Sequence, residues 1–82
     1  MSPKDQFDRI EIDPNILLGK PVIKGTRIPV YVILDLISEG STPREILEYY
    51  PSLKEEDITA AVKFAAAAAR YRELEFETEV VG

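Results

Sequence analysis

The stretch G-K-P-V-I-K-G-T-R-I-P-V, residues 19–30, separates a short polar N-terminal part from a longer part with helical signals. It holds two glycines, two prolines and three cations among β-branched residues. Glycine permits a positive φ or a close backbone approach, and proline fixes φ and removes a donor. So many residues that constrain the backbone in one short stretch predict a structured connector between a strand layer and the first helix. Its structural signature is Gly19, Pro21, Gly25, Thr26, Arg27 and Pro29.

Composition limits the chemistry that is open to this chain. Its 82 residues predict one small domain, covering residues 1–82, that buries about 60–65% of its unfolded surface. The absence of cysteine excludes disulfides and thiolate metal sites, and the absence of histidine removes the commonest general base. No secretory leader or long apolar run is present, so we expect a soluble, cytoplasmic protein without metal or cofactor.

The part before residue 29 predicts short strands. Residues 7–13 alternate loosely, with Ile10 and Ile12 on one face, which is typical of a half-buried strand. Residues 22–23 and 26–28 flank Lys24-Gly25 and predict a small hairpin. We therefore expect residues 1–28 to form a strand and turn arm on the helical part.

Residues 29–72 predict a three-helix core. The first helix begins with Pro29, is apolar nearly all round, which predicts burial, and ends before Gly40. Thr42 and Glu45 form a capping box for a second helix over residues 43 to about 50. A weaker pair, Ser52 and Glu55, precedes a third helix over about 54–72. The short second and long third helix suggest a helix-turn-helix unit, and a plain three-helix packing unit is equally compatible.

Residues 73–82 predict a C-terminal strand, because apolar residues alternate with glutamates there. A single amphipathic strand needs a mate: the N-terminal strand, a second copy, or another protein. The predicted partner or dimer contacts are Leu74, Phe76, Val80, Glu75 and Glu77. The overall expectation is a mainly α fold with short N-terminal strands and an acidic C-terminal strand.

The net charge of −5 disfavours nucleic-acid binding except through a local basic patch. Three cations and no acids fall between residues 14 and 34, so phosphate contact is one interpretation of Lys20 and Lys24. Arg27 is better explained by an internal pair with a helix carboxylate such as Glu45 or Asp57. The acids at residues 55–57 oppose base readout by the third helix, although they suit its dipole. The candidate DNA contacts are Lys20, Lys24, Lys63 and Arg70.

Catalysis has little support, because no nucleophile, base and orienting group can be assigned together. The motif G-K-P-x-I-x-G-T-R-I-P-V, the helix ending in glycine, and Y-P-x-L-x-x-E-D-I before an alanine-rich helix resemble the domain-of-unknown-function 433 family. The resemblance covers about residues 13–71. Lys54 departs from the threonine cap that is common in the family, and the tail after Tyr71 lies outside the shared pattern.

The resemblance implies a dimeric, homeodomain-like protein that serves as a VapB-like antitoxin. It would bind and neutralise a PIN-like ribonuclease toxin and repress its own promoter as part of a complex. Two alternatives stay open: a stand-alone dimeric helix-turn-helix regulator, which needs the four cations on one face, and a purely structural dimerisation module. In none of these roles does the chain act on a small molecule or a membrane.

Overall fold

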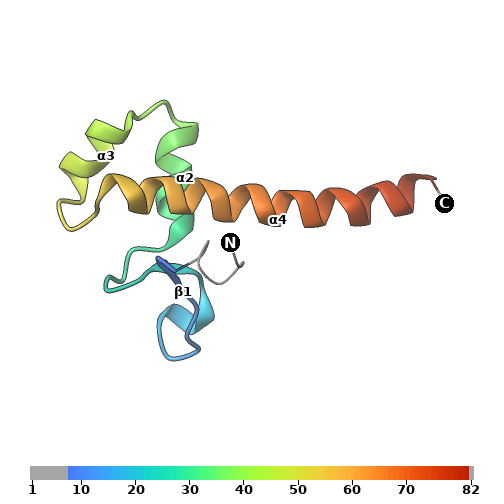
Figure 1. Cartoon of the computed structure of the whole chain (residues 1–82), viewed down its shortest axis with the longest axis horizontal. Coiled ribbons are helices and arrows are strands. Elements are labelled where there is room, and N and C mark those ends of the chain that lie inside the picture. The colour runs from blue at the N-terminus through green and yellow to red at the C-terminus, as the bar shows by residue number, and fades with distance from the viewer. Residues whose placement is uncertain (1–7, 82) are drawn as a thin grey trace.

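The structure, a computed structural model, describes the backbone of residues 8–81 and the side chains of residues 8–71. The elements follow in the order β1 (Ile10–Glu11), η1 (Leu17–Gly19), β2 (Val22–Ile23), α2 (Val30–Ser38), α3 (Pro43–Tyr49) and α4 (Glu55–Val81). Figure 1 shows α2 and α3 packed beside the first half of α4, with the β1 region below them. The predicted mainly α fold with short N-terminal strands is confirmed.

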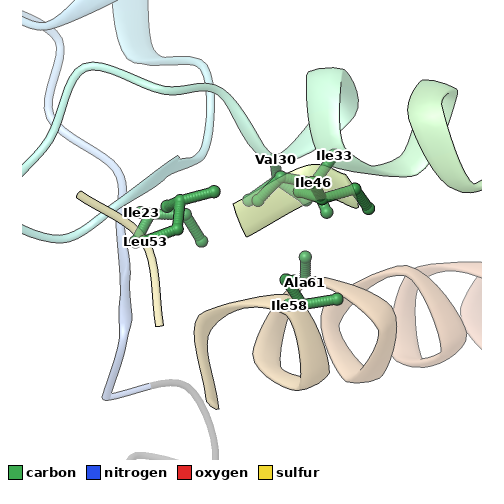
Figure 2. Packing of buried hydrophobic residues seen from close by; sticks show 7 residues of the cluster. All are labelled: Ile23, Val30, Ile33, Ile46, Leu53, Ile58 and Ala61. Carbon is green, nitrogen blue, oxygen red and sulfur yellow. The ribbon is translucent and has the colours of Figure 1, made fainter. Parts of the chain in front are cut away.

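The core joins all three helices and the strand layer. Its buried cluster lies where α2 and α3 cross the start of α4, and Figure 2 shows the α4 members facing those of α2 and α3. Ile33 and Ile46 are fully buried at this crossing. The cluster consists of Ile23, Val30, Ile33, Ile46, Leu53, Ile58 and Ala61.

The strands are held by a tight connection between β2 and α2. β1 pairs with β2 in an antiparallel register, with Ile10 opposite Ile23. On the other side of β2, Ile23 N–H donates to the carbonyl of Ile28 at 3.0 Å, and Val22 forms a single bridge with Pro29. The expected hairpin is thus reduced to a tight turn, in which Gly25 has a φ of +81°. Since Pro29 is bridged and extended, α2 begins one residue later than predicted, at Val30.

The end of α2 and the start of α3 follow the predicted capping. Gly40 has a φ of +95°, and the N–H groups of Gly40 and Ser41 donate to the carbonyls of Ile37 and Leu36. This is the Schellman arrangement that ends a helix. Before α3, Thr42 Oγ1 accepts from Glu45 N–H at 3.2 Å, and Glu45 Oε1 accepts from Thr42 N–H at 2.8 Å. The capping box is confirmed.

We expect Thr42→Ala to lower the free energy of unfolding by about 1 kcal/mol, because the Glu45 N–H would lose its acceptor. Thermal unfolding followed by circular dichroism measures the change. Thr59→Ala is the matched control, since Thr59 is exposed within α4, where alanine is the better helix former. Equal losses in the two variants would contradict a capping role for Thr42.

Two expectations about the helices are wrong. α2 is not buried all round: Tyr31 is 51% and Ile37 is 37% exposed, because a domain with three helices covers only part of this one. The C-terminal strand is also absent, because α4 continues as a helix to Val81. No glycine or proline occurs between residues 70 and 81, so the cooperative helix propagates through residues whose alternation suggested a strand.

Candidate functional site

The most unusual backbone of the described residues lies in η1. Leu17 and Leu18 have φ values of +48° and +58°, and the following Gly19 has +85°. A left-handed conformation costs an L-residue with a side chain about 1–2 kcal/mol. Leu18 is nevertheless 94% exposed, so burial of its side chain does not offset this strain. Strained backbone of this kind tends to cluster at functional sites.

Hydrogen bonds around the loop hold the two leucines in this conformation. The N–H groups of Ile16 and Asn15 donate to the carbonyl and carboxylate of Asp13, at 2.8 and 2.9 Å. The N–H of Gly19 donates to the carbonyl of Ile16 at 3.0 Å, and that of Lys20 to Leu17 at 3.2 Å. The exposed leucines are therefore presented by a fixed turn.

The loop forms one wall of an open groove of about 440 Å³. Its apolar surface is flanked by Lys20 and Arg27, and Lys20 Nζ lies 5.1 Å from the centre of the Tyr31 ring, a cation–π distance. Exposed apolar side chains beside two cations suit a segment that is both apolar and acidic. We call this surface the dileucine groove; it is lined by Leu17, Leu18, Lys20, Arg27, Pro29, Tyr31 and Val32.

Arg27 does not make the internal pair that the sequence suggested. Arg9 Nη1 donates to Asp57 Oδ1 at 3.0 Å, and Glu45 is bound to the α3 cap. Among the residues that the structure describes, no carboxylate lies within ion-pair distance of Arg27, which is exposed on the groove. The prediction of Arg27 as an internal tie is wrong, because Arg9, immediately before β1, lies beside the start of α4 and pairs with Asp57.

Asp57 joins the strand layer to α4. Its side chain is 8% exposed, and its second oxygen, Oδ2, accepts from Lys54 N–H at 2.9 Å. Lys54 precedes the first residue of α4, so Asp57 supplies one half of a capping box, the half that Glu55 was expected to supply. One buried carboxylate therefore caps the helix and anchors Arg9.

A second open groove, of about 490 Å³, lies beside this junction. Its charged lining mixes acids with cations, so it favours neither an anion nor a cation. It is lined by Asp8, Arg9, Glu55, Glu56, Thr59, Ala60 and Lys63.

The predicted DNA contacts are divided between these surfaces. Lys20 lines the dileucine groove, whereas Lys63 lines the second groove. Lys24 Nζ lies 3.8 Å from Asp8 Oδ1, and both side chains are exposed. Arg70 is exposed seven residues beyond Lys63, which places the two on one side of α4. The structure thus brings Lys63 and Arg70 to one side of α4 and leaves Lys20 on another surface.

The predicted partner contacts Leu74, Glu75, Phe76, Glu77 and Val80 fall in the last part of α4. Their side chains lie outside the described residues, but their backbone is helical. Positions 74 and 76 are therefore separated by about 200° around the helix axis and cannot form the single apolar face of a strand. We call residues 72–81 the α4 extension.

Sequence reasoning missed the leucines of the groove and Tyr31. Leucine is not expected at a positive φ, so no residue preference marks this turn. The available signal was an adjacent pair of large apolar residues, Leu17 and Leu18, in a short connection between Pro14 and Pro21. Such a pair outside a helix or strand is a candidate for an exposed apolar contact.

The fold defines a small helical domain with a short two-stranded antiparallel sheet. The chain belongs to the family described as a protein of unknown function, DUF433, whose model matches residues 10–65. The α4 extension lies beyond that match.

Two proteins and one crystal structure illustrate the similarity. The chain is 43% identical to the uncharacterised protein y4eO of Sinorhizobium fredii over 54 residues, 66% of this chain but 24% of that protein. It is 58% identical over 24 residues to an uncharacterised protein of Archaeoglobus fulgidus, covering 29% of this chain and 67% of that one. A DUF433 member from Anabaena variabilis has a TM-score of 0.71 and 31% identity, with coverage of 82% of this chain and 66% of that chain.

The described residues hold neither a metal centre nor a membrane-spanning helix. No group of three or more metal-ligating side chains among them is placed to hold an ion. Within the same residues, no helix is long and apolar enough to cross a membrane.

Proposed function

We propose that this protein is a non-enzymatic antitoxin of a type II toxin–antitoxin pair, which binds and neutralises a PIN-like ribonuclease. The observation that carries the proposal is the course of α4. Figure 1 shows this helix continuing well past the other elements, and the molecule measures 47 × 30 × 29 Å. Phe64 is partly buried against the core, and the described α4 residues from Ala68 onwards are exposed. A helix that projects beyond its own core is suited to binding in the groove of a partner.

The charge of the extension supports a ribonuclease as that partner. After Arg72, the extension carries four glutamates and no further cation. A ribonuclease must attract RNA phosphates with a basic surface, and an acidic helix is complementary to such a surface. We therefore propose that the extension competes with RNA for the basic surface of the toxin.

Co-expression with the product of the adjoining open reading frame tests this function. We expect the two proteins to co-purify and the ribonuclease activity of the partner to fall when this chain is added. Glu75→Gln/Glu77→Gln should weaken inhibition about tenfold or more, since it removes two of the acids. Glu39→Gln/Glu48→Gln, at exposed positions of the core, is the matched control and should inhibit like the wild type. Failure of the wild type to bind or inhibit would refute the proposal.

We further propose that operator binding is a property of the complex and not of this chain alone. Lys20 and Lys63 line different grooves, and Glu55, Glu56 and Asp57 occupy the first turn of α4. That turn is where a recognition helix would approach the bases, so these acids oppose phosphate contact. In a mobility-shift titration at 0.15 M salt, the complex should retard its own upstream DNA and the isolated chain should not. A shift by the isolated chain, abolished by Lys63→Glu/Arg70→Glu, would favour the stand-alone regulator.

A further inference from the structure

We propose that, in the absence of a partner nuclease, the dileucine groove binds the α4 extension of a second copy of this chain. Two copies would then exchange their extensions reciprocally. The proposal goes beyond the antitoxin role, because it concerns the state of the chain before it meets the nuclease. It rests on the groove, on the sequence of the extension, and on the direction of α4.

The groove supplies an apolar surface and two positive charges. Leu18 is 94% and Tyr31 51% exposed, so both offer apolar area to an incoming segment. Lys20 and Arg27 line the same groove, and no described carboxylate pairs with either side chain. Among the described residues, no negative charge therefore complements the two cations of the groove.

The α4 extension has the complementary composition. After Arg72 it contains only acids, apolar residues and one threonine before Gly82. Its glutamates at positions 73, 75, 77 and 79 complement the two cations. Leu74, Phe76, Val80 and Val81 supply apolar groups of the kind that Leu17, Leu18 and Tyr31 can cover. No other ten-residue stretch of the sequence without a cation holds as many acids as residues 73–82.

The direction of α4 makes the occupant a second copy. α4 is one continuous helix to Val81, and Figure 1 shows its last turns running away from the segment that carries the groove. A chain could reach its own groove only by breaking this helix. Reciprocal exchange between two copies needs no break in the helix, and each extension covers the groove of the other copy. The two copies are then related by a two-fold axis, the commonest symmetry of soluble oligomers.

Charge reversal tests the contact through oligomeric state. Sedimentation velocity of the full chain without nuclease should show a dimer that dissociates on dilution. Lys20→Glu/Arg27→Glu, the groove variant, should raise the dimer dissociation constant at least tenfold. The extension variant, Glu73→Lys/Glu75→Lys/Glu77→Lys/Glu79→Lys, should raise it as much. A mixture of these two variants should again form dimers, because each reversed groove then meets a reversed extension. The mixture also shows that both variants are folded.

A matched control separates this contact from general attraction between chains of opposite net charge. Arg44→Glu/Lys54→Glu reverses two exposed cations outside the groove and should dimerise like the wild type. Mixed with the extension variant, this control should form fewer mixed dimers than the groove variant does, because its unreversed groove repels the reversed extension. A monomeric wild type at 100 µM, or a dimer unaffected by both reversals, would overturn the proposal. So would a groove reversal that abolishes nuclease binding and leaves the dimer intact.

The two proposals can fail separately. A monomeric protein that still inhibits the nuclease would refute the exchanged dimer and support the antitoxin role. A dimer with the expected charge dependence that binds no nuclease would support the exchanged dimer and refute the antitoxin role.

Discussion

Replacing Asp57 with alanine should lower the free energy of unfolding by about 3 kcal/mol, because one buried carboxylate both pairs with a cation and caps a helix. The carboxylate accepts from Arg9 Nη1 at 3.0 Å and from Lys54 N–H at 2.9 Å, and its side chain is 8% exposed. Alanine leaves Arg9 without its partner and the first turn of α4 without this cap. In a domain of this size, such a loss corresponds to a fall in Tm of roughly 10–20 °C.

Companion variants separate the two roles of Asp57. Asp57→Asn retains an oxygen for Lys54 N–H and loses the ion pair, so it should cost about half as much. Glu56→Ala is the control, since Glu56 is exposed in the same helical turn and should change stability by less than about 0.5 kcal/mol. Urea unfolding followed by circular dichroism measures all three. If Asp57→Ala and Glu56→Ala lower the free energy of unfolding equally, the buried Asp57 carboxylate contributes no more to stability than an exposed charge.

Leu18→Asn should have opposite effects on folding and on association. Asparagine tolerates the left-handed conformation better than leucine, so relief of strain should raise the free energy of unfolding by about 1 kcal/mol. An exposed leucine has almost no burial to lose in the monomer. In the exchanged dimer it would be a central apolar contact, and its removal should weaken dimerisation about tenfold.

The stability of this variant must be measured on dilute protein, where mass action removes the contribution of the dimer. Under these conditions the gain corresponds to a rise in Tm of about 4–8 °C. Ile12→Asn is the control, since Ile12 is 59% exposed and is not among the described residues with a positive φ. Ile12→Asn should not raise the free energy of unfolding. A loss of stability in Leu18→Asn would show that the left-handed leucine is not strained.

Local signals in the sequence predicted the helical core well. The Thr42 capping box and the glycine after α2 are specified by short-range chemistry, and both occur in the structure. The C-terminal strand was wrong because alternation of glutamate with apolar residues is compatible with either structure, and helix propagation from the alanines decided between them. Periodicity over one short segment carries no information about what precedes it.

The ion pair and the groove depend on tertiary placement. A cation was expected opposite Asp57, but sequence cannot distinguish Arg9 from Arg27 before the strand layer is positioned on α4. Leu17 and Leu18 are at positive φ because the fixed turn between Asp13 and Lys20 requires it, against the preference of leucine. Strain of this kind is visible only in the assembled fold.

The pairing of Arg9 with Asp57 also has a consequence for the order of folding. The two residues are 48 positions apart, whereas the helix caps join residues three to five positions apart. Contacts between distant residues form slowly, because a long loop must close first. During synthesis Arg9 is made early, yet its partner appears only when the first turn of α4 does. We therefore expect the N-terminal strand to pack onto the domain last, after the helices have assembled.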